Sequence, residues 1–166
     1  MQERSAEESV EAISARVEEY LGQLGQFSRA GDDTFLAKRG STVVGIHVVD
    51  DGTGEPQVLV QAAVVSGADL LASPELLRSL LEHNHQSRYG WFAVDQEGRI
   101  WLRHVFRGGS LTREELLPAV SEVAKAADDW DDMIVEEVGG ERALDLLQAA
   151  SGGEDDGDTP AGEGDA

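Results

Sequence analysis

Short polar turns divide the strongest β-forming part of this chain into strands that must run antiparallel. Between residues 34 and 65 the chain contains three β-rich runs, "TFLAK", "STVVGIHVVD" and "PQVLVQAAVV". The first two are separated by "RG" and the last two by "DGTGE". Connections this short join neighbouring antiparallel strands, whereas parallel strands need a crossover of about a dozen residues or more. We therefore predict a three-stranded meander and exclude a doubly wound parallel sheet.

Helical patterns stand on both sides of this meander. Apolar residues recur every three or four positions over residues 10–24, which predicts an amphipathic helix. A leucine-rich helix follows the cap Ser73, and a hairpin of "YGWFAV" and "RIWLRHVF" comes next. Thr112 and Glu115 form a capping box for a long third helix, and residues 141–150 are predicted as a short terminal helix. The predicted fold is α+β, an antiparallel five-stranded sheet with helices packed on it in the order α-β-β-β-α-β-β-α.

The composition changes sharply after residue 150. The segment 151–166, "SGGEDDGDTPAGEGDA", has six acids, no base and no large apolar side chain. Such a segment cannot bury enough apolar surface to offset the entropy of ordering. The remaining length and an apolar content of 40% suit one domain with a core of its own. We predict a single α+β domain over residues 1–150 and a disordered acidic tail over residues 151–166.

Charge and cysteine usage narrow the classes of partner. With six of its 33 acids in the tail, the chain still has 27 acids against 13 bases in residues 1–150. This excess of acids argues against a nucleic-acid partner, because binding to nucleic acid requires a dense basic face. Four arginines from Arg99 to Arg113 could still form a local basic stripe. The chain has no cysteine, which excludes disulfides and thiolate metal sites. No run is apolar enough for a membrane span, so we expect a cytoplasmic protein with no membrane partner.

The run "LEHNHQSRYGWF" is the most suggestive for chemistry, because His83 and His85 stand two residues apart beside a glutamate. On a helix such residues point about 200° away from each other and do not converge on one metal ion. Histidines at the end of a helix instead interact favourably with its partial negative charge. Asn84 would satisfy backbone groups as the chain turns toward the strand at Trp91. A metal-dependent enzyme or sensor that uses His83 and His85 remains the alternative interpretation.

The run "RIWLRHVFR" alternates along a predicted strand. Arginine and tryptophan are enriched where proteins bind one another, so the arginine-bearing face is a candidate binding surface, with a merely solvated face as the alternative. The opposite face is apolar except at His104. The candidate partner-binding or dimer surface comprises Trp91, Arg99, Trp101, Arg103 and Arg107. No nucleophile elbow or phosphate-binding glycine loop is present, so we predict no enzyme activity and no cofactor.

The two stretches "LLRSLLEHNHQSRYGWFAVDQEGRIWLRHVF" and "LTREELLPAVSEVAKAADDWDDMI" resemble the YbjN family of bacterial proteins. That family is sometimes labelled a sensory-transduction regulator, and it shares its fold with type III secretion chaperones. The resemblance covers about residues 5–137 in element order. It implies a helix-and-sheet sandwich that commonly dimerises and offers a surface for extended peptides. It also implies that the second helix and the Trp91 strand contribute to a dimer interface.

The residues and the resemblance together predict a non-enzymatic module that binds a protein or peptide. We expect a YbjN-like regulator with a secretion-chaperone-like fold that acts as a homodimer. The sheet and its arginine strand are the expected contact surface for the partner.

Overall fold

The computed structural model of the protein describes residues 9–50, 52 and 54–146. Its helices are α1 (Val10–Leu21), α2 (Pro74–Gln86) and α3 (Arg113–Val138), with short 3-10 turns at Gly22–Leu24, Leu70–Ala72 and Gly108–Ser110. Its strands are β1 (Phe27–Arg29), β2 (Thr34–Arg39), β3 (Thr42–Val49), β4 (Gln57–Ser66), β5 (Trp91–Val94), β6 (Ile100–Arg107) and β7 (Glu141–Arg142). The predicted acidic tail lies outside the described residues.

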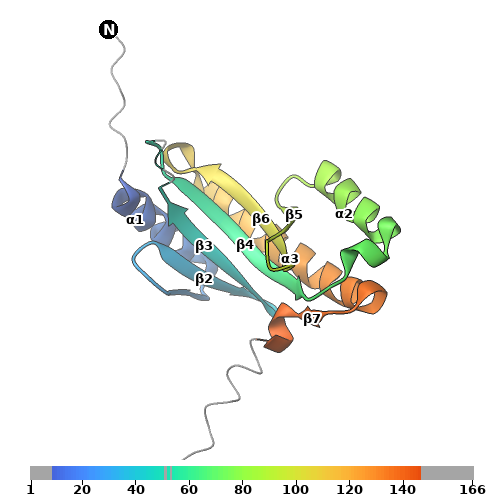
Figure 1. Ribbon diagram of the computed structural model, residues 1–166. Coiled ribbons are helices and arrows are strands. Elements are labelled where there is room, and N and C mark those ends of the chain that lie inside the picture. Colours follow the sequence, from blue (N-terminus) through green and yellow to red (C-terminus); the bar gives the residue numbers. More distant parts are fainter. Residues whose placement is uncertain (1–8, 51, 53, 147–166) are drawn as a thin grey trace, which may run out of the picture.

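All the strands belong to one antiparallel sheet with the order β1-β2-β3-β4-β6-β5, and β7 pairs with the end of β4. The predicted α+β class and the antiparallel meander are confirmed, with β2, β3 and β4 as neighbours. The second hairpin, β5 and β6, joins the meander through its second strand, so β5 becomes an edge of the sheet (Figure 1).

The prediction of five strands is wrong, because the sheet has seven. The two additional strands, β1 and β7, are three and two residues long. Segments this short show no alternation that a sequence pattern could reveal. The predicted helix at residues 141–150 is corrected in its first part, where Glu141 and Arg142 pair with Ser66 and Val65. Residues 143–146 are helical, and residues 147–150 lie outside the described part.

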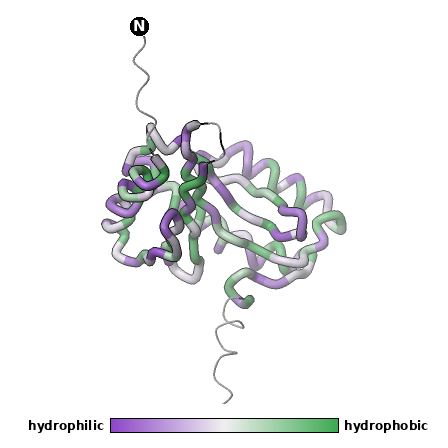
Figure 2. The backbone as a smooth tube through the Cα atoms, turned by 60° about the vertical axis from the view of Figure 1, so that its left-hand side comes forward, coloured by the Kyte–Doolittle hydropathy of each residue, from purple (hydrophilic) through white to green (hydrophobic). Residues whose placement is uncertain are grey.

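One face of the sheet packs against α1 and α3, which run behind it in Figure 1. Phe35, Ile46 and Ile100 lie on this face and are completely buried. They meet Ile13 of α1 and Val123 of α3 in a single apolar cluster. Burying a side chain of this size contributes about 1.5–3 kcal/mol, so this cluster is the main source of stability. Figure 2 shows hydrophobic and hydrophilic stretches alternating along the tube, as expected for elements with one buried side.

The helix ends follow the capping residues. Ser9 caps α1 by accepting a hydrogen bond from the backbone N–H of Ala12. Ser73 caps α2 in the same way, and the predicted capping box of Thr112 and Glu115 is present at the start of α3. The helix α2 lies beyond the β5 edge of the sheet (Figure 1). Within the described ranges, no helix is both long and apolar enough to cross a membrane.

Candidate functional site

The face of the sheet opposite α1 and α3 is not crossed by a helix in the described part of the chain (Figure 1). Along β2, β3 and β4, buried positions alternate with more exposed ones, and the more exposed ones share this side. The residues in register with them on β1, β6 and β5 lie on the same side. We call these strand positions the open face. They are Ser28, Thr34, Leu36, Lys38, Val43, Gly45, His47, Val49, Gln57, Leu59, Gln61, Ala63, Trp91, Ala93, Trp101, Arg103, Val105 and Arg107.

A row of paired residues crosses the middle of the open face. Leu36 is paired with Gly45, Gly45 with Gln61, Gln61 with Arg103, and Arg103 with Trp91. Glycine in the interior of a strand often marks a place where other atoms approach the backbone closely. Here the ring of a neighbouring histidine does so, since a Cβ on Gly45 would lie 2.7 Å from its Nε2 atom. The absence of a side chain at Gly45 therefore leaves room for this imidazole ring over the backbone of β3.

The histidine over Gly45 is His47, which is held by polar neighbours. Its Nδ1 lies 3.3 Å from the Thr34 hydroxyl and its Nε2 lies 3.4 Å from the Gln61 amide nitrogen. Burial lowers the pKa of His47, while the nearby charge of Asp33 acts in the opposite direction. The ring is therefore predominantly neutral at pH 7 and adds no fixed charge to the face.

Two shallow grooves hollow the open face. The first, of about 480 Å³, is lined chiefly by Thr34, His47, Val49, Leu59 and Gln61, with Asp33 and Asp50 at its rim. The second, of about 420 Å³, is lined by Gln26, Phe27, Ser28, Leu36, Lys38 and Val43. Both grooves are wide open and mostly apolar, and they lie on either side of the row through Gly45. Their shape suits an extended chain segment better than an enclosed small molecule.

The structure brings only some of the predicted surface residues together. Arg103 is half-buried and stands between Gln61 of β4 and Trp91 of β5. Trp91 remains 39% exposed, which is high for a large aromatic side chain. Arg107 lies at the far end of β6 with 80% of its side chain exposed and is 3.8 Å from Glu55. The alternation predicted for β6 is thus correct, with Ile100 and Leu102 completely buried on the opposite face.

Arg99 and Trp101 are held by the hairpin turn through one carboxylate, that of Asp95. Its Oδ2 accepts hydrogen bonds from the Trp101 indole at 2.9 Å and the Arg99 Nε at 2.8 Å. Its Oδ1 accepts from the backbone N–H groups of Glu97 and Arg99. These donors, the Trp101 indole first, hold the pKa of Asp95 well below its usual range. Arg99 is therefore engaged in shaping the turn, and it also lies over the Trp101 ring at 5.6 Å.

The side chain of Asn84 pairs with backbone groups on the outer edge of β5. Its side-chain oxygen accepts a hydrogen bond from Phe92 N–H at 2.6 Å, and its amide donates to Phe92 C=O at 3.2 Å. The expectation that Asn84 satisfies backbone groups near Trp91 is confirmed. An unpaired edge strand is a template for pairing with another chain. With Phe92 paired to a side chain, a partner strand has no access to this part of the edge.

The two histidines of α2 point to different surroundings. The ring of His83 makes edge contacts with Phe92 at 5.1 Å and Trp130 at 5.5 Å, and burial lowers its pKa. His85 is exposed. Among the described residues, no group of three or more histidine, aspartate or glutamate side chains is placed to hold a metal ion. Nothing in this geometry supports the alternative of a metal site built on His83 and His85.

His104, which interrupts the apolar face of β6, belongs to an aromatic cluster beside the end of β5. Its ring lies 4.9 Å from Trp91, 5.4 Å from Tyr89 and 4.5 Å from Phe106. Its Nδ1 accepts a hydrogen bond from Gly90 N–H at 3.2 Å, and burial lowers its pKa. The neutral ring therefore ties the loop before β5 to β6.

The residues singled out from the sequence lie on β5, on β6 and in the turn between them, whereas the open face also extends over β2, β3 and β4. Leu36, Lys38, Val43 and Leu59 were missed as surface residues. Only Lys38 has a signal in the sequence, because its side chain is charged. Leu36, Val43 and Leu59 are as apolar as their buried neighbours, so their exposure shows only in the structure. The role of Asp95 was missed as well, because a turn former gives no sign of which side chains it will hold.

A family model matches residues 7–146 of the 166-residue chain. The family is TY-Chap1, described as "T3SS (YopN, CesT) and YbjN peptide-binding chaperone 1". The chain belongs to the TY-Chap1 family. The resemblance to YbjN proteins and to chaperones of the type III secretion system is thereby confirmed. A comparison with curated protein sequences finds no match.

Several solved structures of protein complexes, including chaperone complexes, have folds similar to that of this TY-Chap1 chain. A chain of the ExoU–SpcU heterodimer of Pseudomonas aeruginosa is 14% identical with a TM-score of 0.55, over 71% of this chain and 97% of that one. A chain in the complex of the Yersinia pestis type III secretion chaperone SycH with a YscM2 fragment is 14% identical with a TM-score of 0.51. The match covers 70% of this chain and 98% of that one. A chain in the ExsC–ExsE complex is 17% identical with a TM-score of 0.52. The match covers 73% of this chain and 95% of that one. At these identities the matches establish a shared fold.

Proposed function

We propose that this protein is a non-enzymatic module that holds an extended segment of a partner protein against the open face of its sheet. The observation that carries the proposal is the open face itself, which combines two open grooves of mixed polar and apolar lining with exposed apolar side chains such as Leu36 and Val49. The family match supports it, because the family is described as peptide-binding. By holding or releasing its partner, such a module regulates what that partner can do.

The face is a better binding surface for a peptide than the β5 edge. Asn84 occupies the hydrogen-bonding groups of Phe92 that an added strand would need. On the open face the backbone groups of β3, β4 and β6 are already paired within the sheet. A bound segment therefore makes side-chain contacts there, and its apolar residues are buried in the grooves.

The first prediction concerns Leu59, which lies in the larger groove. The variant Leu59→Asp is expected to retain far fewer peptides than the wild type when a proteolytic digest of a bacterial lysate passes over the immobilised protein. The reason is that a charge in the groove must be desolvated when an apolar residue binds. Retained peptides are identified and counted by mass spectrometry.

The matched control is Met133→Asp, which places the same charge at a half-exposed apolar residue of α3. It is expected to retain peptides as the wild type does. Thermal unfolding of both variants shows whether each is folded. Equal retention by folded Leu59→Asp and Met133→Asp would place the binding surface elsewhere.

We further propose a homodimer formed through the end of the molecule that contains α2 and β5. Four large apolar residues are exposed in this region: Leu71, Leu81, Trp91 and Val94. An association that covers them removes apolar surface from water. This use of α2 and the Trp91 strand agrees with what the family resemblance implies.

The second prediction is that Leu81→Asp converts the dimer to a monomer. Leu81 is 67% exposed in the single chain, so the aspartate is well tolerated there and is unfavourable only inside an interface. Sedimentation equilibrium measures the mass of the wild type, of Leu81→Asp and of the control Met133→Asp. A wild-type protein that is monomeric at about 50 µM would contradict the proposed dimer, because a dimer with a Kd of about 1 µM is largely associated at this concentration.

A further inference from the structure

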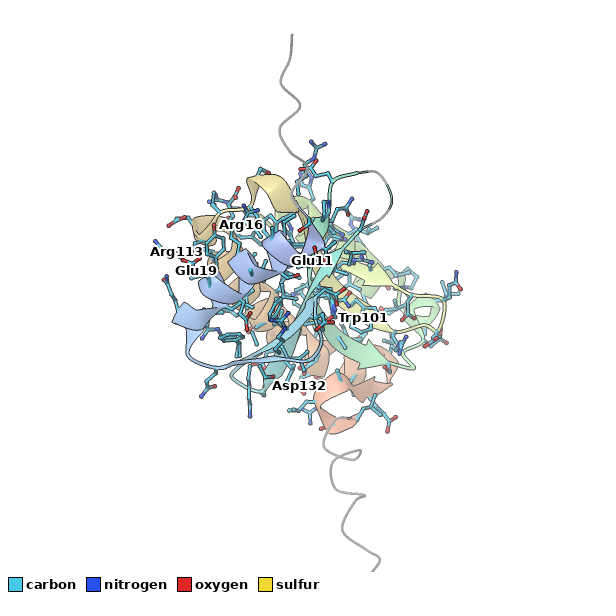
Figure 3. All side chains as sticks on the ribbon, turned by 90° about the vertical axis from the view of Figure 1, so that its left-hand side faces the viewer. Glu11, Arg16, Glu19, Trp101, Arg113 and Asp132 are labelled. Carbon is cyan, nitrogen blue, oxygen red and sulfur yellow. The ribbon has the colours of Figure 1, made fainter. Side chains whose placement is uncertain are left out.

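Charge is distributed very unevenly between the two sides of this molecule. The helix α3 carries nine acids and two bases, and the chain as a whole has a net charge of −20. None of the strand positions of the open face is an acid, although the described part of the chain is rich in them. In Figure 3, Glu19 and Arg113 lie on the left in the helical layer, and Trp101 lies to their right over the strands.

The open face carries cations that the protein itself leaves largely uncompensated. Within the described ranges, Lys38 and Arg103 take part in no ion pair. Arg107 has one carboxylate nearby, at 3.8 Å, and this pair is exposed and therefore weak. Acids border the face only at its ends, with Asp33 and Asp50 at the rim of the larger groove. A half-buried arginine that has no carboxylate partner, such as Arg103, can form strong charge-assisted hydrogen bonds with a carboxylate of another molecule.

We propose that the segment held on the open face is acidic as well as apolar. Every second residue of the segment faces the sheet, and among these facing residues acids alternate with apolar residues. This inference rests on the proposed function and names the class of its partner. Along β6 the open face presents Trp101, Arg103, Val105 and Arg107 in sequence, which alternate between apolar and cationic. An extended peptide directs every second side chain to one side, with the same spacing as the strand beneath it.

A segment with the facing pattern apolar, acid, apolar, acid therefore matches β6 position by position. Its acids meet Arg103 and Arg107, and its apolar residues meet Trp101 and Val105. The acidity of the remaining surface does not prevent this binding, because at physiological ionic strength charges are screened beyond about 8 Å. The peptide therefore interacts electrostatically mainly with the cations of the open face, because the acids of α3 lie on the other side of the sheet.

The test uses three synthetic nine-residue peptides that share leucine at alternate facing positions. The remaining facing positions are glutamate in one, glutamine in the second and lysine in the third. Binding to the full chain is measured by fluorescence anisotropy at an ionic strength of about 0.15 M, where the screening length is short. We expect the glutamate peptide to bind about tenfold more tightly than the glutamine peptide and the lysine peptide to bind least.

The variant Arg103→Glu makes the test specific for this residue. It is expected to reverse the order, so that the lysine peptide binds most tightly. Because Arg103 has no ion pair in the described structure, its replacement breaks no contact of that kind. The matched control is Lys125→Glu on α3, which changes the net charge equally and is expected to keep the wild-type order.

The other outcomes separate two failures. If the glutamine peptide binds as tightly as the glutamate peptide and Arg103→Glu changes neither, the acidic preference is wrong while the proposed function stands. If none of the three peptides binds, the proposed function fails and this inference fails with it. A fourth peptide with the sequence of residues 151–166 is acidic but has no large apolar residue. If this peptide binds as tightly as the glutamate peptide, the open face selects for acidic residues alone. The proposed alternation of acids and apolar residues is then wrong, and the segment 151–166 of this chain becomes the candidate ligand.

Discussion

Replacing Gly108 with alanine is expected to lower the free energy of unfolding by about 2–3 kcal/mol. Gly108 is buried where the end of β6 meets α1 and the loop before β4. A Cβ at this position would lie 2.7 Å from the backbone oxygen of Pro56 and would also overlap the side chain of Ile13. Ile13 is completely buried, so it has little space into which to move.

The backbone around Gly108 makes this collision costly to relieve. Its N–H donates a hydrogen bond of 2.8 Å to the same Pro56 oxygen, and its carbonyl accepts one from the Arg16 guanidinium. Moving Pro56 away from a new methyl group would lengthen the first bond, and moving Gly108 would disturb both. The strain therefore cannot be released by one side-chain rotation.

The matched control is Gly22→Ala, at the end of α1. Gly22 has a helical φ of −52°, and a Cβ there would meet no heavy atom within 4 Å. Both substitutions change the unfolded chain in the same way, and at Gly22 this raises stability by about 0.4–1 kcal/mol. Urea denaturation followed by circular dichroism measures both. Equal midpoints for the two variants would show that Gly108 is not tightly packed.

The long elements of the fold could be predicted from the sequence because their patterns are local. The three-four spacing and the caps Ser73 and Thr112 identify helices, and the turns between β2, β3 and β4 determine their antiparallel pairing. The pairing of β6 with β4 could not be predicted, because it joins residues about 40 positions apart, such as Gln61 and Arg103. No local pattern records such a contact, since the two strands are far apart in the sequence and either strand of the hairpin could pair with β4.

The candidate surface was predicted in part for the same reason. Alternation along one strand correctly separates Trp101 and Arg103 from Ile100 and Leu102. It could not show that Arg99 is engaged by the turn, because that depends on the geometry of the Asp95 carboxylate. It also could not show that Arg103 lacks an ion pair within the described structure, which is a property of the neighbouring strands. The open face becomes visible only when the strands are placed side by side.

The second large effect is expected at Asn84, which holds the exposed edge of β5. Replacing Asn84 with leucine leaves the N–H and the C=O of Phe92 without their side-chain partner. Each partly buried polar group that loses its hydrogen bond costs about 1–3 kcal/mol, and partial access of water reduces this. We expect the free energy of unfolding to fall by about 2 kcal/mol. Urea denaturation measures this change.

The same substitution is expected to change how the protein associates. With Asn84 gone, the backbone groups of β5 become available to an edge strand of another molecule, and such pairing leads to aggregation. Light scattering should therefore show large species that grow with protein concentration. Gln86→Leu is the matched control, because Gln86 is exposed at the end of the same helix. It introduces the same apolar side chain without freeing Phe92, so it should remain unaggregated. Aggregation of both variants to the same extent would show that surface leucine, and not the freed edge, is responsible.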